Sequence, residues 1–326
     1  MKSRIIGNVE VFLSEPVTRP IEWIGRRELI EQLLACWTLV AEDDLPLYPR
    51  ILGQPGMGKT TLAQAAAKEM GLDAYIFQCT TDTRPEDLLI TPVLSDQGKI
   101  SYHGSSLVTA MLEGGVAILD EANRMSEKSW ASLAPLFDNR RYVESIVASV
   151  RVEAHPNFRC CVTMNDDAST YEVPEYILSR IQPMIEVDFP TRDDELAILK
   201  YNVQFAPDNL LEMAANFLHA AHGHRLNYST RDGVNIMRYA LKMLQNKMEP
   251  DLPSAFHRAI EAVLGSGAED LKTRAAGQFL GPNTKSIRDI LALLEGEDDD
   301  EDEDDDDEDH EDDSLFDEDP DERGKL

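Results

Sequence analysis

Apolar residues in the first part of the chain fall into short runs that predict buried strands. Five such runs alternate with helical stretches, at residues 48–52, 73–79, 115–120, 159–165 and 184–189. Strands that alternate with helical patterns indicate a parallel sheet covered on both faces, and such strands read as nearly continuous apolar runs. The runs GVAILD and MIEVDF read in this way. The pattern therefore predicts an α/β fold with a five-stranded parallel sheet.

The strand signal stops at about residue 192, and helical patterns follow. The predicted helices cover residues 193–202, 208–219, 230–247, 254–264 and 284–294, with Pro or Gly between them. In the third helix, Val234, Met237, Leu241 and Leu244 recur at helical spacing, which is typical of a stripe that faces a core. This part of the chain is therefore expected to form a smaller, all-helical domain.

The charge is concentrated at the end of the chain. Of 61 acidic and 31 basic residues, 22 acidic and 2 basic residues lie at 295–326, so this segment carries −20 of the net charge of −30. Such a segment cannot bury enough apolar surface to order itself, and we expect a disordered acidic tail. The pair Leu315–Phe316 is its only apolar interruption. The tail is either simply solvated or carries a short docking motif at this pair.

Composition also narrows the class of protein. The body lacks the basic stripe that a duplex-DNA binder needs, so we expect no nucleic-acid partner. No apolar segment is long enough to span a membrane and the N-terminus shows no signal-peptide pattern, so we expect a soluble, cytoplasmic protein without membrane insertion. The four cysteines lack metal-site spacing and are expected to be reduced core residues. They are Cys36, Cys79, Cys160 and Cys161.

A phosphate-binding motif follows the first predicted strand. The stretch Gly53-Gln-Pro-Gly-Met-Gly-Lys-Thr60 matches G-x-x-x-x-G-K-[ST] and opens a helical stretch. Its glycines allow a backbone nest of N–H groups to face phosphate oxygens at a helix N-terminus. Lys59 is expected to reach the β- and γ-phosphates, and the Thr60 hydroxyl to hold Mg²⁺. The residues expected to bind ATP are Gly53, Gln54, Pro55, Gly56, Met57, Gly58, Lys59, Thr60, Thr61 and Asp120.

Acidic and amide side chains end two further strands. The run ending in Asp120 and Glu121 could be a strand end followed by a helix cap, but beside the phosphate motif it indicates a catalytic pair. Asp120 is expected to hold Mg²⁺ through water, and Glu121 to orient and polarise the attacking water. Asn165, at the end of the strand at 159–165, could position that water, or could only begin a turn.

Together these residues resemble the AAA+ superfamily of P-loop ATPases. The stretch Asp120-Glu-Ala-Asn-Arg124 is similar to the D-E-[IA]-N-R signature of the MoxR group, which includes the CbbQ, NorQ and GvpN proteins and is related to dynein modules. The segments at 87–107 and 134–141 resemble this group's pore-facing insert and a following helix end. The resemblance spans about residues 22–245. It implies an N-terminal segment and first helix packing on the core (1–47), an αβα nucleotide-binding core (48–191), a helical lid (192–294) and the acidic tail (295–326).

The resemblance also assigns roles to two arginines and to a segment that would contact the substrate. Arg180 aligns with the arginine finger that acts on a neighbouring subunit's phosphate, although Ser179 replaces the usual Asp and a surface ion pair is the alternative. Arg231 resembles the sensor-2 arginine of the lid, acting in its own subunit or across the interface. Tyr102 and His103, on a hairpin expected after Gly98, are possible pore contacts. Here His-Gly-Ser-Ser replaces the group's R-P-G-P, so the resemblance does not say how this segment would bind a substrate.

The functional expectation follows from these assignments. The chain is expected to form a homo-oligomeric ring, most simply a hexamer, that hydrolyses ATP with Mg²⁺. Like the MoxR group, it would remodel, activate or assemble a partner protein, one with a von Willebrand A domain being the leading candidate. Two alternatives stay open: an ATP-gated switch or scaffold with little turnover, and a nucleic-acid motor.

Overall fold

The computed structural model describes residues 2–265, apart from 19–20, 95–97 and 167–171. Its central sheet has five strands in the order β11-β3-β10-β7-β4, and all neighbours are parallel. The strands are β3 (Arg50–Gly53), β4 (Ala74–Gln78), β7 (Val116–Asp120), β10 (Arg159–Asn165) and β11 (Met184–Glu186). Four of these strands lie within the predicted apolar runs and β3 overlaps the fifth, which confirms the predicted fold class.

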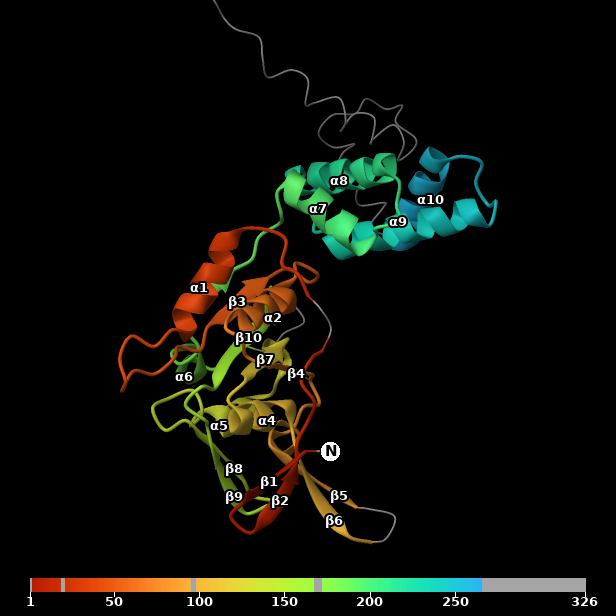
Figure 1. Cartoon of the computed structure of the whole chain (residues 1–326). Coiled ribbons are helices and arrows are strands. Elements are labelled where there is room, and N and C mark those ends of the chain that lie inside the picture. Colours follow the sequence, from red (N-terminus) through yellow and green to blue (C-terminus); the bar gives the residue numbers. More distant parts are fainter. Residues whose placement is uncertain (1, 19–20, 95–97, 167–171, 266–326) are drawn as a thin grey trace, which may run out of the picture.

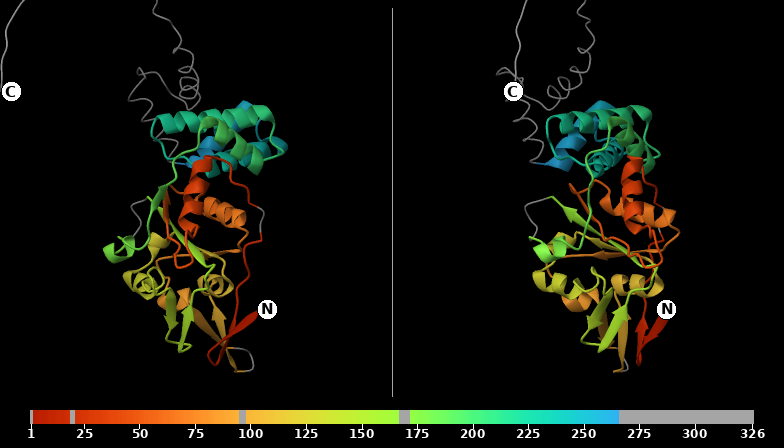
Figure 2. Two further views of the ribbon diagram at one scale, coloured as in Figure 1. Left: turned by 60° about the vertical axis from the view of Figure 1, so that its left-hand side comes forward. Right: turned by 90° about the vertical axis from the view of Figure 1, so that its left-hand side faces the viewer.

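Helices cover both faces of this sheet, as the two views in Figure 2 show. On one face, α1 (Arg27–Trp37) and α2 (Lys59–Glu69) share a core with Val116 and Ile118 of β7. On the other face, α4 (Ser106–Glu113) and α5 (Glu127–Leu133) pack with Ala117 and Leu119 of the same strand. Successive residues of β7 thus point into different cores, which explains why this strand is apolar throughout.

Three hairpins lie at the end of the core away from the helical domain (Figure 1). One four-stranded sheet has the order β1-β2-β6-β5, in which β2 and β6 pair in parallel, and a separate hairpin joins β8 and β9. The short α3 (Pro85–Leu88) leads into β5. The strands are β1 (Ser3–Ile6), β2 (Val9–Phe12), β5 (Ile90–Leu94), β6 (Ile100–Gly104), β8 (Tyr142–Ser145) and β9 (Val150–Glu153). The hairpin expected near Gly98 is β5–β6.

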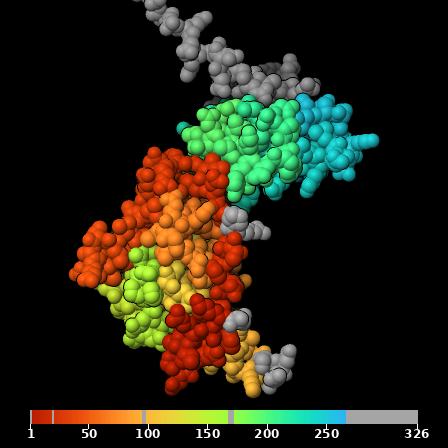
Figure 3. Space-filling model, viewed as in Figure 1, coloured from red at the N-terminus to blue at the C-terminus, as the bar shows by residue number. Residues whose placement is uncertain are grey.

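The C-terminal part of the described chain is a four-helix lid at one end of the core (Figure 3). It consists of α7 (Arg192–Asn202), α8 (Asp208–Gly223), α9 (Thr230–Gln245) and α10 (Leu252–Leu264). These helices have a hydrophobic core of their own, in which Val234 and Met237 are buried and Leu241 and Leu244 are partly buried. The predicted stripe on α9 is therefore confirmed. The helix expected at 284–294 and the acidic tail lie outside the described residues.

The four cysteines are buried free thiols, as predicted. Burial raises the pKa of Cys160 and Cys161 well above the usual range of a thiol, so both are protonated and inert. Among the described residues, no helix is both long and apolar enough to cross a membrane. The cytoplasmic location stays a prediction.

The strand that enters the phosphate loop is packed tightly against the connection to the lid. A Cβ atom added to Gly53 would lie 2.5 Å from the carbonyl oxygen of Val187, whose N–H donates to Leu52 O. Because both contacts involve backbone atoms, neither can move without distorting the β3–β11 pairing. Gly53 is thus required by close approach as well as by its place in the motif.

We expect Gly53→Ala to reduce stability by about 1–3 kcal/mol, because the added methyl group overpacks a backbone contact. Thermal unfolding followed by circular dichroism would measure the loss. Gly223→Ala is the matched control, since nothing lies within 4 Å of a Cβ at this position. Equal melting temperatures for the two variants would contradict the role of the Val187 contact.

Candidate functional site

The phosphate loop connects the end of β3 to the start of α2. Gly56 and Gly58 adopt φ values of 87° and 82°, in the left-handed region that side chains with a Cβ rarely occupy. These two residues turn the chain so that α2 begins at Lys59 with its free N–H groups facing the loop. The glycines of the motif therefore have the conformational role that the sequence predicts.

Lys59 is buried at the centre of this loop. Its Nζ donates to Gly53 O at 2.8 Å, to Gln54 O at 2.9 Å and to Asn165 Oδ1 at 2.8 Å. These oxygens stabilise the ammonium group of a lysine that is only 6% exposed. Phosphate oxygens placed in the loop could take over these bonds, so the lysine is held where a triphosphate would need it.

Asp120 lies between two threonine hydroxyls. Its Oδ1 accepts hydrogen bonds from Thr60 Oγ1 at 2.6 Å and from Thr163 Oγ1 at 2.7 Å. Hydroxyl and carboxylate oxygens are the donors that Mg²⁺ prefers, and two protein groups suffice because this ion keeps several waters and binds phosphates. No cluster of three or more His, Cys, Asp or Glu residues is found in the described part of the chain. Thr60 and Asp120 thus fit a magnesium ion that arrives with a nucleotide.

Glu121 is turned away from Asp120 by its backbone. Its φ of 54° is left-handed, and its N–H donates to Thr163 Oγ1 at 3.0 Å. Asn165 Nδ2 donates to Glu121 Oε1 at 3.2 Å. Asn123 holds the backbone of Asn165 on both sides, because its amide donates to Asn165 O and accepts from Asn165 N. Sequence analysis missed Thr163 and Asn123, although both flank predicted site residues.

The lid closes the site from above. A cavity of about 610 Å³ is lined by the phosphate loop, Asp120, Glu121 and Asn165, and on the lid by Thr230 and Arg231. A Cβ on Gly56 would lie 2.5 Å from Ser229 Oγ, so the start of α9 packs directly on the loop. Ser229 and Asp232 form a capping box that fixes this helix end. Arg231 therefore lies beside the phosphate loop although 171 residues separate it from Thr60 in sequence.

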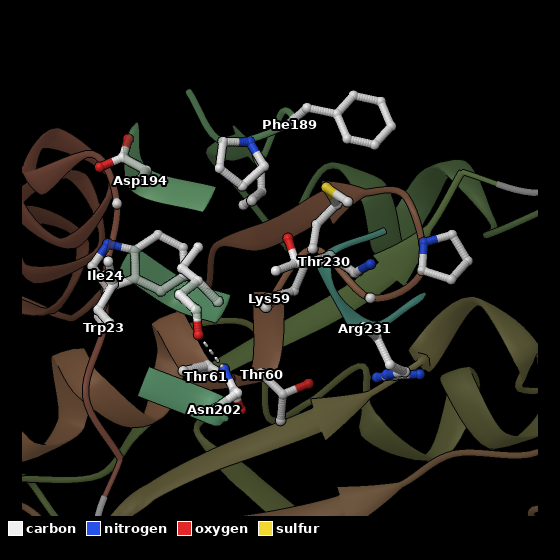
Figure 4. A pocket seen from close by; sticks show the side chains of 18 of the residues that line it. Trp23, Ile24, Lys59, Thr60, Thr61, Phe189, Asp194, Asn202, Thr230 and Arg231 are labelled. Carbon is white, nitrogen blue, oxygen red and sulfur yellow. Dashed lines mark hydrogen bonds between the residues drawn. The ribbon is translucent and has the colours of Figure 1, made fainter. Parts of the chain in front are cut away.

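Aromatic and apolar residues line the far end of the same cavity. Figure 4 shows Trp23 and Ile24 at one end of the pocket, Arg231 at the other and Lys59 between them. A Cβ on Gly58 would lie 3.3 Å from the ring of Trp23. A flat apolar group such as a nucleobase suits this end, since aromatic rings stack on such groups. We did not predict Trp23 or Ile24, and the only signal was an apolar pair just before the first helix.

Arg180, the predicted arginine finger, lies away from the nucleotide cavity of its own chain. It follows the short α6 (Glu175–Leu178) and does not line the cavity of its own chain. Its Nη1 donates to Tyr176 O, and its Nε lies 3.6 Å from Asp138 Oδ2. Arg140 donates to the same carboxylate from Nε and Nη2, and these bonds hold the pKa of Asp138 at about 2. Arg141, by contrast, is buried and donates to the carbonyls of His155 and Phe158, which is a structural role.

Tyr102 and His103 lie within β6 and not at the hairpin tip. Both are half-buried, and His103 packs at 5.2 Å from the ring of Phe12 on the neighbouring β2. The exposed apolar side chains at this end of the molecule belong to other residues. They include Ile5 of β1, exposed by 77%, Leu94 and Ile100 of the β5–β6 hairpin, exposed by 70% and 62%, and Ile146 of the β8–β9 turn, exposed by 90%.

A buried acid lies at the base of α9. Glu195 on α7 has a fully buried side chain whose Oε1 accepts from Thr230 Oγ1 at 3.0 Å. Its Oε2 has His222 Nδ1 at 3.8 Å, and the His222 ring stacks on Phe189 of the connection to the core. Burial raises the pKa of Glu195 to about 7 and lowers that of His222. This carboxyl group thus fixes the residue next to Arg231.

Comparison with known proteins identifies the domain. Residues 50–181 match the model of the AAA domain, dynein-related subfamily. The chain is similar to the denitrification regulatory protein NirQ of Pseudomonas aeruginosa, with 28% identity over 45% of this chain and 56% of that protein. It is also similar to the protein CbbQ of Hydrogenophilus thermoluteolus, with 25% identity over 61% of this chain and 74% of that protein.

A longer relative and a solved structure complete the comparison. The mouse von Willebrand factor A domain-containing protein 8 is 26% identical over 59% of this chain, which spans only 11% of that protein. A mutant RuvB of Thermotoga maritima has a TM-score of 0.51 at 17% identity, covering 83% of this chain and 82% of that one, and this likeness shows the fold alone.

The fold and site therefore define a P-loop nucleotide-binding protein of the AAA+ class. Its core at residues 50–181 belongs to the AAA domain family, dynein-related subfamily. The resemblance to MoxR-type ATPases is confirmed by the similarity to CbbQ and NirQ. The chain spans only about half the length of NirQ, so the activity and partners of the whole protein belong to the proposal below.

The raised pKa of Glu195 predicts a pH-dependent stability. Because its folded-state pKa of about 7 exceeds the ordinary value of 4.5, folding favours the neutral acid. The wild type should therefore lose stability as pH rises from 4.5 to 7, by on the order of 3 kcal/mol. Glu195→Gln stays neutral, so its melting temperature relative to wild type should rise between pH 5 and pH 8.

Denaturation at a series of pH values would measure this difference. Glu212→Gln, which changes an exposed glutamate on α8, should show no comparable rise. A difference between Glu195→Gln and wild type that does not change with pH would contradict the assignment.

Proposed function

We propose that this chain is an ATPase that acts in a ring and uses ATP to remodel a partner protein. The observation that carries the proposal is the convergence of Lys59, Asp120, Glu121 and Asn165 in one cavity under the lid. A nucleotide-binding fold explains the phosphate loop alone. The carboxylate and amide aimed at the same space are what hydrolysis requires in addition.

In this mechanism, the loop N–H groups and Lys59 bind the triphosphate, while Trp23 and Ile24 contact the base. Thr60 and Asp120 would hold Mg²⁺, which neutralises charge on the phosphate oxygens when it is bound. Transfer of the lysine bonds from Gly53 O, Gln54 O and Asn165 Oδ1 to phosphate releases the Asn165 amide. Binding of ATP therefore rearranges the catalytic groups as well as occupying the loop.

For hydrolysis, a water between Glu121 and the γ-phosphate is the nucleophile. The Glu121 carboxylate accepts a hydrogen bond from this water and takes its proton as the new P–O bond forms. Asn165 orients the water through its side-chain amide, while Asn123 holds the backbone of Asn165 at this edge of the sheet. The products are ADP and phosphate.

A ring is proposed because Arg180, the residue that resembles an arginine finger, does not line the cavity of its own chain. Arg180 lies outside its own cavity and is partly exposed beside Asp138. A neighbouring subunit that docks this surface against the open cavity would place a guanidinium near the γ-phosphate. Closed rotational symmetry then gives every site the same arrangement, and we propose a hexamer.

The lid converts occupancy into movement. Arg231 lines the cavity, and the contact between Ser229 and Gly56 joins α9 to the phosphate loop. An arginine drawn to the γ-phosphate would tilt a lid that has its own core and moves as a unit. Whether Arg231 reaches the phosphate of its own subunit or of a neighbour's depends on the ring.

The proposed client is a protein, bound at the hairpin end of the ring. Leu94, Ile100 and Ile146 expose apolar side chains there, whereas Tyr102 and His103 support the sheet. One relative contains a von Willebrand A domain by name, which supports a client with such a domain. The solved RuvB structure does not favour a nucleic-acid motor, because its likeness to this chain concerns the fold only.

We expect Lys59→Ala to abolish ATP binding, because the loop loses its central cation. Glu121→Gln should bind ATP with an affinity close to that of wild type and lower turnover by about 100-fold or more, since it removes the base. Isothermal titration and a phosphate-release assay separate binding from chemistry. A chain that binds ATP but never hydrolyses it, with or without a client, would instead be a switch.

The shared site predicts complementation between two inactive variants. Arg180→Ala alone should lower turnover by about 100-fold or more, as removal of arginine fingers does elsewhere. Mixed with Glu121→Gln, it should regain activity at about a quarter of the interfaces, where an intact Glu121 meets an intact Arg180.

Mixing Lys59→Ala with Glu121→Gln is the matched control, because no interface then holds a complete site. Absence of recovery in the Arg180→Ala mixture, in rings shown to exchange subunits, would rule out action in trans.

A further inference from the structure

Glu195 and His222 form a buried polar pair beneath the first turn of α9. The Glu195 side chain is fully buried, and that of His222 is 10% exposed. One carboxyl oxygen, Oε1, accepts from Thr230 Oγ1 at 3.0 Å. The other, Oε2, lies 3.8 Å from His222 Nδ1 and has no hydrogen-bond partner among the described residues. A buried polar oxygen without a partner costs free energy, so the protonation state of the acid decides how stable this arrangement is.

The histidine ring has a fixed tautomer. His222 Nε2 lies 2.7 Å from Tyr228 O, and because a carbonyl oxygen only accepts, Nε2 carries the proton. Burial lowers the pKa of His222, so the ring is neutral and Nδ1 presents a lone pair to Glu195 Oε2. An ionised Oε2 would be repelled by this lone pair. A protonated Oε2 can donate to it once the two groups approach to hydrogen-bond distance, so the geometry favours the neutral acid.

No cation contacts the Glu195 carboxyl group within the described part of the chain. Its contacts there are Thr230 and His222, and burial raises the pKa of Glu195 to about 7. The charged and titratable groups on α7, α8, α9 and the connection to the core are exposed, bonded elsewhere or face the cavity. These groups are Asp188, Arg192, Asp194, His219, Arg231 and Asp232.

The carboxyl group is linked to the nucleotide cavity through the start of α9. Thr230, which it binds, lines the cavity together with the next residue, Arg231 (Figure 4). Thr230 is also the first residue of the helix, so a shift of its side chain carries the arginine with it. On the other side of the pair, the His222 ring stacks at 3.9 Å on Phe189, a further lining residue. The buried pair thus joins three lid helices to the connection with the core.

We propose that Glu195 is a positioning residue for Arg231 and that its neutral form sets this arginine for the γ-phosphate of ATP. This inference rests on the proposed ATPase function and adds to it a residue that acts through Thr230. In the neutral acid, Oε1 holds the Thr230 hydroxyl and the proton on Oε2 faces His222. Ionisation places a buried charge against the lone pair of His222 Nδ1, so the pair separates and the start of α9 is released. Affinity for ATP therefore falls as pH rises through about 7.

The test is nucleotide binding to the full chain, measured by isothermal titration. Every variant is built on a parent that carries Glu121→Gln, so that ATP is not consumed. ATP and ADP are the two probes, because only ATP has the γ-phosphate. At pH 6, Glu195→Ala should weaken ATP binding by about three- to tenfold, the effect of one lost hydrogen bond, and leave ADP binding close to that of the parent. Thr230→Val, which removes the hydroxyl group, should act in the same way.

Glu195→Gln separates a positioning role from a purely structural one. Its amide accepts from Thr230 and donates to His222 Nδ1 at every pH, so it should match the parent at pH 6. Between pH 6 and pH 8, the ATP Kd of the parent divided by that of Glu195→Gln should rise by about three- to tenfold. Taking this ratio at each pH cancels the titration of ATP itself. Glu212→Gln, which changes an exposed glutamate of the lid, is the control and should follow the parent.

A double variant tests whether Glu195 acts through Arg231. In a chain with Arg231→Ala, the further change Glu195→Ala should leave ATP binding as it is, because the positioned group is already absent. Additive effects, equal weakening of ATP and ADP, or a Kd ratio that does not change with pH overturns the inference. If Glu195→Ala does not fold, the same criteria apply to Thr230→Val. Failure of the proposed function is distinct, since ATP would then bind equally well to the Lys59→Ala chain.

Discussion

Parallel pairing of β10 between β3 and β7 is the constraint on which the site depends. The register places Asn165 opposite Gly53 and Val162 opposite Leu119, so the carboxyl ends of all three strands meet at one edge. The buried ammonium of Lys59 then bridges β3 and β10, and the hydroxyl of Thr163 bridges β10 and β7. A shift of one residue in either pairing would turn these side chains to the opposite face.

The sequence predicts the sheet well because burial on both faces leaves a strong signal. The strand β10 was predicted to its ends, since every residue from Arg159 to Asn165 is buried. The strands β1 and β2 were missed because each has only four residues of mixed polarity, and β6, with which β2 pairs, lies about ninety residues away. Pairing over such a distance leaves no periodicity that local reading can detect.

The residues of the site also differ in whether a local sequence pattern can reveal them. Lys59 and Asp120 can be identified from the sequence because each belongs to a motif. Residue spacing defines the motif, and the adjacent strand or helix pattern supports it. Trp23 and Thr163 could not, since their roles arise from neighbours that only the folded chain supplies. Tyr102 and His103 show a different limit: the segment lies on the expected hairpin, but the degree to which each side chain is exposed depends on packing against β2.

The exposed apolar side chains at the hairpin end have a consequence for the free chain. Leu94, Ile100 and Ile146 offer water-exposed apolar groups on strands and turns, which are surfaces through which proteins adhere to one another. The net charge of −30 opposes such adhesion, because chains that carry the same charge repel. The acidic segment at 295–326 contributes most of this charge, and with it a colloidal barrier that weakens as salt concentration rises. Ionic strength thus governs whether free chains stay dispersed or precipitate.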